Sequence, residues 1–179
     1  MRDVTRLLAR RRVTLGFAAG ALVLWRARPT PASLAIGMPI AALGEALRVW
    51  AAGHLNKARE VTASGPYRLF AHPLYVGSSA IGAGVAIASS SAVVAAVIAT
   101  YLIATIGAAI RTEEAFLRTT FGGEYERYRS ARVGAAAGAA RRFSVRQAIA
   151  NREHRAVAGF LAALLWLVLK ATYNGMFWR

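Results

Sequence analysis

Residues 73–110, PLYVGSSAIGAGVAIASSSAVVAAVIATYLIATIGAAI, decide the fold, because none of these 38 residues is Asp, Glu, Lys or Arg. At about 20 apolar residues per membrane crossing, the stretch is long enough for two helices. The triplet Ser89-Ser90-Ser91 marks the place for a turn between them. A soluble domain would interleave charge along amphipathic helices. This stretch therefore predicts a helical hairpin inside a membrane.

Three further apolar segments bring the expected number of spans to five; they cover residues 13–25, 31–55 and 156–169. The 179-residue chain is 56% hydrophobic, and its mean hydropathy is +0.40. We therefore expect an all-α fold, a polytopic membrane helical bundle of about five transmembrane helices that forms one domain over residues 1–179. The first segment is short enough for a cleaved signal peptide. However, Gly16-x-x-x-Gly20 offers a close-packing helix face, which favours a retained span.

The distribution of positive charge predicts the topology. The net charge is +15, from 23 Lys+Arg and 8 Asp+Glu. With a cytoplasmic N-terminus, 18 of the 23 cationic residues lie on the inner side; those outside are Arg26, Arg28 and Arg179, and Arg48 and Lys170 fall within spans. Because basic loops stay in the cytoplasm, we expect an N-in, C-out protein of the bacterial inner (plasma) membrane. The basic residues flank apolar segments, which favours anionic lipid headgroups over nucleic acid as partners.

Two polar segments remain on the cytoplasmic side, residues 56–72 and 111–155. We expect them to form the functional site, which would then lie on the cytoplasmic face of the membrane. Inside the membrane, Glu45 and Arg48 lie three residues apart on one helix face and are expected to pair. The chain has no Cys. Disulfides, thiolate nucleophiles and Cys-based metal sites are therefore excluded, and we expect no metal.

The first polar segment ends at the start of a predicted helix. Pro73 suits the first helical position, because its missing N–H would be unpaired there in any case. His72 then lies at the cap and Tyr75 in the first turn, where free N–H groups and the helix dipole favour an anion such as a ligand carboxylate. The alternative is that His72 and Tyr75 only anchor the helix at the membrane interface.

The second polar segment begins with two adjacent glutamates. Glu113 and Glu114 point about 100° apart on a helix. One of them can therefore face the bundle while the other pairs with Arg118 at i+4. The alternative is that both carboxylates are solvated.

Four blocks of sequence lie in order between residues 53 and 133: Gly65-Pro66-Tyr67; His72-Pro73-Leu74-Tyr75-Val76-Gly77; Glu113-Glu114 with Leu117; and Phe121-Gly122-x-Glu124-Tyr125-x-x-Tyr128. Their residues and spacing resemble the isoprenylcysteine carboxyl methyltransferase and phospholipid methyltransferase family of membrane enzymes. The resemblance implies a methyltransferase that uses S-adenosylmethionine and releases S-adenosylhomocysteine. It also implies a lipid-linked or hydrophobic small-molecule acceptor at the cytoplasmic face of the membrane.

The same resemblance implies the site residues. The cofactor-binding residues would be Tyr67, His72, Pro73, Leu74, Tyr75, Gly77, Glu113 and Glu114. The catalytic candidates would be Glu113, Glu114 and Arg132, with Arg132 orienting an acidic acceptor or, as the alternative, contacting a lipid headgroup. Side chains of these types suit the carboxylate, ammonium and ribose hydroxyls of the cofactor. Methyl transfer from a sulfonium depends mainly on positioning.

The chain departs from the family pattern in two places. Ala71 stands where an Arg usually precedes His-Pro, and the segment after Arg132-Val133 is rich in Gly and Ala where the family has Pro. The missing cation leaves open a membrane reductase of similar architecture with a nicotinamide cofactor. The basic loops leave open a non-catalytic, lipid-binding member of the family. The polar cluster at residues 141–155 is interpreted first as a positive-inside anchor.

Overall fold

The computed structural model describes residues 16, 20–57, 59–130 and 141–173, and every regular element in this part of the chain is helical. The elements are α2 (Pro31–His54), the 3₁₀ helix η1 (Gly65–Arg68), α3 (Pro73–Ala88), α4 (Ala92–Phe121), α5 (Gly123–Ser130), α6 (Val145–Ala150) and α7 (Glu153–Tyr173). Residues 20–26 are also helical. The expected all-α membrane bundle is confirmed.

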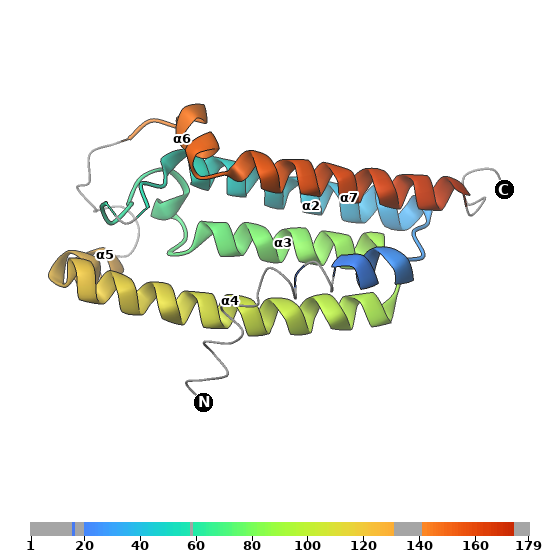
Figure 1. Ribbon diagram of the computed structural model, residues 1–179, viewed down its shortest axis with the longest axis horizontal. Helices are drawn as coiled ribbons and strands as arrows, with labels where there is room; N and C mark the ends of the chain where they lie inside the picture. Colours follow the sequence, from blue (N-terminus) through green and yellow to red (C-terminus); the bar gives the residue numbers. More distant parts are fainter. Residues whose placement is uncertain (1–15, 17–19, 58, 131–140, 174–179) are drawn as a thin grey trace.

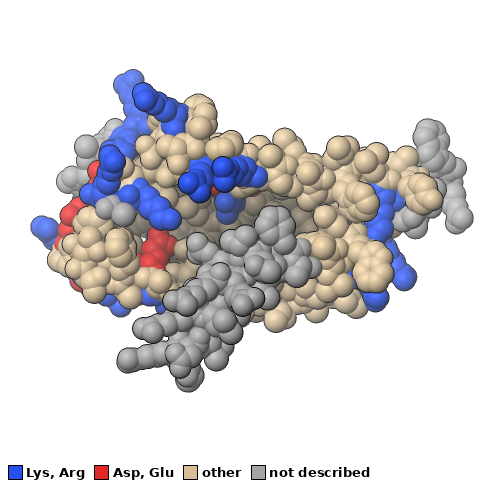
Figure 2. Space-filling model, viewed as in Figure 1, with Lys and Arg blue, Asp and Glu red and all other residues tan. Residues whose placement is uncertain are grey.

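The four long helices lie side by side in the order α7, α2, α3, α4 (Figure 1). Helices α2 and α4 run in one direction, and α3 and α7 run in the other (Figure 1). The short helices α5 and α6 lie at one end of the bundle, and the turn between α3 and α4 lies at the other (Figure 1). Lys and Arg side chains gather mainly at the end that carries α5 and α6 (Figure 2).

Three helices, α2, α4 and α7, are long and apolar enough to cross a membrane. Only 11% of the most apolar stretch of α4, and the same share of α7, is buried, so these helices present apolar surface to lipid. Helix α3 begins and ends where the sequence predicts, but at 16 residues it is shorter than a full crossing. Of the predicted first span, residues 13–25, the structure describes residue 16 and residues 20–25, and these are helical.

The polar residues between α3 and α4 form the predicted turn. Ser89 donates through Oγ to the Ala86 carbonyl at 2.7 Å. Ser90 has a φ of 47°, and Ser91 caps α4 by accepting from Val94 N–H. At its other end, α4 continues to Phe121, about 16 Å beyond the predicted span end at Ile110. This extension carries Glu113 and Glu114 out of the apolar stretch.

Glycines bring α2 and α3 into the closest helix packing of the bundle. Gly37 of α2 faces Gly84 of α3, and Gly44 of α2 faces Gly77 of α3. Within each helix the two glycines are seven residues apart and therefore lie on one face. A Cβ on Gly84 would lie 2.4 Å from the Ala41 nitrogen and 2.5 Å from the Gly37 carbonyl oxygen. The two backbones touch here because small residues allow it, as in other membrane helix pairs.

A buried ionic network joins α2, α3 and α7. The predicted pair is present, with Arg48 Nε 3.7 Å from Glu45 Oε2. The shorter contacts of Arg48 go to Glu153 Oε1, at 2.9 Å from Nε and 2.8 Å from Nη2. Arg48 Nη1 also donates to Ser78 Oγ at 2.5 Å. Glu153 is therefore the main partner of Arg48, although it lies 105 residues away in the chain.

Part of the polar cluster at residues 141–155 closes the end of α2. Asn151 Nδ2 donates to the carbonyls of Ala52 at 2.8 Å and Leu55 at 2.9 Å. Gln147 Nε2 donates to the same Leu55 carbonyl at 2.9 Å. The last carbonyls of a helix have no partner within it. Segment α6 therefore supplies these hydrogen bonds, which is a structural role for this cluster.

Candidate active site

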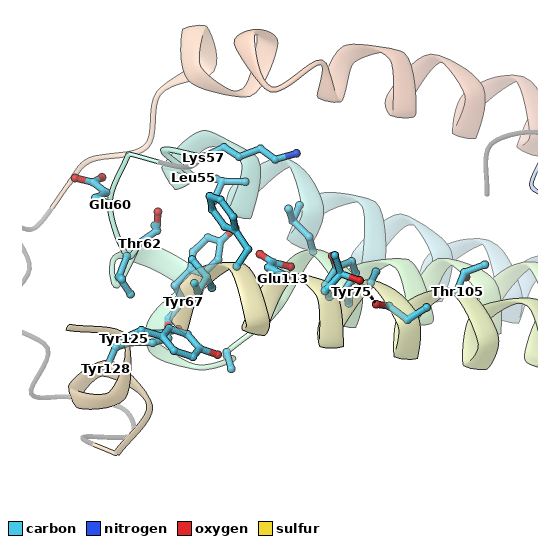
Figure 3. A pocket seen from close by; sticks show the side chains of 18 residues that line it. Leu55, Lys57, Glu60, Thr62, Tyr67, Tyr75, Thr105, Glu113, Tyr125 and Tyr128 are labelled. Atoms are coloured by element: carbon cyan, nitrogen blue, oxygen red, sulfur yellow. Dashed lines mark hydrogen bonds between the residues drawn. The ribbon is translucent and has the colours of Figure 1, made fainter. Parts of the chain in front are cut away.

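A cavity of about 470 Å³ lies at the predicted site, between the loop after α2, η1, the start of α3, α4 and α5 (Figure 3). Most of its wall is apolar. It draws residues from both predicted cytoplasmic segments and from the span part of α4; those labelled in Figure 3 are Leu55, Lys57, Glu60, Thr62, Tyr67, Tyr75, Thr105, Glu113, Tyr125 and Tyr128.

The turn at Gly65 places Tyr67 on this cavity. Gly65 has a φ of 58°, in the region that favours glycine, and a Cβ there would meet the His54 ring at 2.7 Å. The η1 turn that follows is tied to α5, since Tyr128 Oη donates to the Tyr67 carbonyl at 2.9 Å. Tyr67 and Tyr128 therefore line the same cavity although they are 61 residues apart.

The start of α3 has the predicted form. His72 is the N-cap and Pro73 takes the first helical position. The His72 ring makes no capping hydrogen bond and instead turns to the two glutamates of α4. Its Nδ1 lies 3.8 Å from Glu113 Oε2, and its Nε2 lies 3.6 Å from Glu114 Oε1. His72 Nε2 is buried and makes no hydrogen bond to any residue that the structure describes.

The two glutamates have different surroundings, as the helix geometry predicts. Glu113 lines the cavity. Glu114 accepts from Arg129 Nη1 at 2.7 Å and from Arg118 Nη2 at 3.4 Å, which confirms the predicted i+4 pair. Glu114 lies beyond the apolar part of α4. Burial would raise the pKa of Glu114, but the hydrogen bond and charge of Arg129 outweigh it and hold the pKa below its usual range. Glu114 therefore stays ionised and hydrogen-bonded to Arg129 and Arg118.

Four tyrosines, Tyr67, Tyr75, Tyr125 and Tyr128, give the cavity hydroxyls and aromatic faces. Burial, together with the charge of Glu113, raises the pKa of Tyr67. Burial, with smaller effects from Tyr125 and Glu113, raises the pKa of Tyr128 to about 12. Burial also raises the pKa of Tyr125. At neutral pH these phenols remain protonated donors, and their ring faces can attract a ligand cation.

Among the described residues, one Lys or Arg lines the cavity, and sequence reasoning did not predict it as a site residue. Ala71, which stands where the family usually has an Arg, is part of the wall. Lys57, from the loop after α2, lies on the same cavity (Figure 3). Position 57 could not be chosen from the sequence, because the loop that brings it to the cavity has no motif. The site therefore still contains a cation, Lys57, although position 71 is Ala.

The structure brings some of the predicted site residues together and separates others. Tyr67, Leu74, Tyr75 and Glu113 line the cavity, and His72 and Glu114 contact each other beside it. Two residues face elsewhere: Pro73 is buried at the start of α3, and a Cβ on Gly77 would lie 2.6 Å from the Gly44 carbonyl oxygen of α2. Arg132 lies outside the described residues. The roles of all these residues remain predictions.

The arrangement suits a small polar molecule with an ionic end. A volume of about 470 Å³ lies within the roughly 300–1,000 Å³ of small-molecule sites. The cavity offers two carboxylates, an ammonium, phenols and the N-terminus of α3. Beside it, His72 Nε2 is buried and lies 3.6 Å from Glu114 Oε1, which is longer than a hydrogen bond. Within the described residues, no group of three or more His, Asp or Glu side chains could hold a metal ion.

The comparison with protein families matches the chain to phospholipid methyltransferases over residues 33–124. This region begins in α2 and includes η1, α3 and both glutamates of α4. It covers more than half of the chain and agrees with the family resemblance of the four sequence blocks. Searches of curated proteins and of solved structures found no match. The chain belongs to the phospholipid methyltransferase family of membrane methyltransferases.

Proposed function

We propose that this protein transfers a methyl group from S-adenosylmethionine to a lipid-linked or other hydrophobic acceptor, in the manner of isoprenylcysteine carboxyl methyltransferases. The observation that carries the proposal is the cavity on which Tyr67, Tyr75 and Glu113 converge from three elements. When bound, S-adenosylmethionine supplies an electrophilic methyl group on a positively charged sulfur. The residues of this chain bind and orient the reactants and exclude water around them.

The chemistry of the wall fits the cofactor. Lys57 and the positive end of the α3 helix dipole suit its carboxylate. Glu113 suits its ammonium or ribose hydroxyls, and the tyrosine faces suit a sulfonium cation. Beside the wall, His72 adds a buried ring nitrogen that makes no hydrogen bond within the described part of the chain, its contact with Glu114 Oε1 being 3.6 Å. A buried polar group without a partner costs about 1–3 kcal/mol, so a ligand that satisfied it would bind more tightly.

Glu113 is also the best candidate for a group that accepts a proton from the methyl acceptor. It lies on the cavity, and within the described residues its one ion-pair partner is His72, at 3.8 Å. Glu114 is a weaker candidate, because Arg129 and Arg118 occupy its carboxylate. An acceptor that is already a carboxylate would need no base at all.

The shape of the cavity supports an acceptor that enters from the bilayer. The wall includes Thr105, Ala108 and Ala109, which belong to the predicted span of α4. Thr105 precedes Glu113 by eight residues, about 12 Å along the helix. The cavity thus extends from the charged end of the bundle into the apolar zone. A lipid-linked acceptor could keep its chain in the membrane while its head reaches the cofactor.

We propose that the charged end faces the cytoplasm of a bacterial cell. Lys and Arg side chains gather at the end with α5 and α6 (Figure 2), and such basic segments stay cytoplasmic and contact anionic lipid headgroups. The chain has no Cys, so single cysteines report on topology without background. A membrane-impermeant maleimide applied to spheroplasts should label Arg28→Cys and spare Glu124→Cys. The reverse pattern would contradict this orientation.

Binding of S-adenosylhomocysteine tests the cofactor assignment directly. We expect calorimetric titration of the detergent-purified chain to show saturable binding. Loss of a charge-assisted hydrogen bond in Glu113→Gln or His72→Ala should weaken it about 10–100-fold. Glu124→Gln is the matched control, because Glu124 is exposed and does not line the cavity. Absence of binding by folded wild type would contradict the proposal. Binding of a nicotinamide cofactor in its place would favour a reductase, and binding of neither would favour a lipid-binding protein.

The role of Lys57 can be tested in the same titration. Lys57→Ala should weaken S-adenosylhomocysteine binding about tenfold, because it removes the cation that faces the cofactor carboxylate. Arg59→Ala is the control, since Arg59 is an exposed cation two residues away that does not line the cavity. Equal affinities of the two variants would exclude Lys57 as the carboxylate ligand.

A further inference from the structure

A second hollow of about 520 Å³ lies between α2 and α7 and shares no lining residue with the cavity described above. Its wall consists of apolar side chains, among them Ala46, Trp50 and Leu161, and one carboxyl group, Glu45. Trp50 is 41% exposed and Leu161 is 58% exposed, so the hollow is a groove that is open along its length. Both helices are long and apolar enough to span the membrane. The groove therefore opens towards lipid.

One carboxylate oxygen of Glu45 lacks a hydrogen bond at the bottom of this groove. Its side chain is only 8% exposed, and Oε1 is buried with no hydrogen-bond partner in the described ranges of the chain. Its other oxygen, Oε2, lies 3.7 Å from Arg48 Nε, which is longer than a hydrogen bond. The donors of Arg48 are directed instead to Glu153 and Ser78. Glu45 is thus a carboxyl group whose hydrogen-bonding capacity is left for something else.

The charges of the network do not balance. Glu45 and Glu153 supply two carboxylates and Arg48 supplies one guanidinium. Glu45 lies nine residues before the end of α2 at His54, which is about 14 Å along the helix from that end. A charge without compensation is costly at that position, and ionisable residues inside a membrane commonly mark a ligand site or an ion path. One added positive charge would make the network neutral.

We propose that this groove binds a hydrophobic amine, with its apolar chain along α2 and α7 and an ammonium N–H donating to Glu45 Oε1. The ligand satisfies the orphaned oxygen and brings the missing positive charge in one step. An acidic amphiphile would be repelled by the Glu45 carboxylate. A neutral alcohol would donate a hydrogen bond to the orphaned oxygen but would leave the negative charge of the network uncompensated. This inference does not depend on methyl transfer, because the groove and the cofactor cavity have separate walls.

Native mass spectrometry of the full chain in detergent, with dodecylamine and 1-dodecanol as probes of equal tail length, tests the proposal. We expect wild type to bind dodecylamine at least about tenfold more tightly, because the amine makes a charge-assisted hydrogen bond. Glu45→Gln should abolish this preference. Ala46→Phe, which fills the groove from an exposed position on α2, should abolish binding of both probes. Leu43→Phe is the matched control, because Leu43 is 72% exposed and lies outside the groove.

Three results would overturn the proposal. The first is equal binding of amine and alcohol by wild type, which would mean that Glu45 takes a proton in place of a cationic ligand. The second is an amine preference that survives in Glu45→Gln or in Ala46→Phe. The third is a wild-type dimer that binds no amine, which would assign the groove to a second copy of the chain. If Glu45→Gln fails to fold, Ala46→Phe and Leu43→Phe alone decide the outcome.

Discussion

Substitution of Gly84 by alanine probes the contact on which the bundle depends. The new Cβ would lie 2.4 Å from the Ala41 nitrogen, 2.5 Å from the Gly37 carbonyl oxygen and 2.7 Å from the Ala41 Cβ, whereas ordinary contacts begin at 3.4 Å. All three obstacles belong to α2 close to its axis, so no flexible side chain can move aside. Helices α2 and α3 must separate by about 1 Å, and a gap of that size forfeits up to half of each dispersion contact.

We expect this overpacking to cost about 3 kcal/mol, the upper end of the usual range. That loss corresponds to a fall in apparent Tm of roughly 6–12 °C for a domain of this size. The assay is thermal unfolding followed by far-UV circular dichroism, in one detergent and at one scan rate, because unfolding of membrane proteins is often irreversible.

The matched control is Gly107→Ala. Gly107 lies within α4, and a Cβ there would meet nothing within 4 Å. Alanine is favoured over glycine in a helix by roughly 0.5–1 kcal/mol, so the apparent Tm should stay the same or rise by a few degrees. The packing argument fails if Gly84→Ala and Gly107→Ala shift the Tm equally.

Three further predictions follow from the buried polar contacts. Arg48→Met should cost about 3–5 kcal/mol of stability, because it leaves two buried carboxylates without a cation. Glu153→Gln should cost less, since Glu45 remains beside the guanidinium. The reverse order of the two costs in chemical denaturation would contradict this prediction. Asn151→Ala should lower stability by about 1–3 kcal/mol, because the Ala52 carbonyl at the end of α2 loses its donor and the Leu55 carbonyl keeps only Gln147. An unchanged denaturation midpoint would argue against this cap. The phenol of Tyr128 has a pKa raised to about 12, so it stabilises the fold fully below pH 10, and this contribution is lost as the pH rises through 12. In an alkaline absorbance titration, Tyr128→Phe should lack the step near pH 12. A step of the same size in the variant would refute the assignment.

Much of the fold follows from the sequence because lipid removes most alternatives. A 38-residue stretch without charge can only form apolar helices, and α3 occupies the predicted residues 73–88. The pair of glutamates on one turn also fixes which carboxylate can meet Arg118. These are local consequences of helix geometry, and both are confirmed.

The remaining contacts depend on which helices become neighbours. Glu153 reaches Arg48 across 105 residues, and only the packing of α7 against α2 brings them together. Arg129 donates a hydrogen bond to Glu114 because the chain turns at Gly122, whose φ is 44°, and α5 folds back towards α4. Arg48, as a charge within a span, did indicate that a partner must exist. The identity of that partner and the position of Lys57 on the cavity required the three-dimensional arrangement.

The measurement that tests the central claim most directly is methyl transfer itself, with the purified chain in liposomes. Methyl-labelled S-adenosylmethionine would be supplied with hydrophobic acceptors that carry a carboxylate, an amine, a thiol or a hydroxyl group. We predict label in the lipid-soluble product for at least one acceptor class, with a loss of about tenfold or more in Glu113→Gln and no loss in Glu124→Gln. No transfer by wild type to any of the four classes, or equal transfer by Glu113→Gln, would contradict the account.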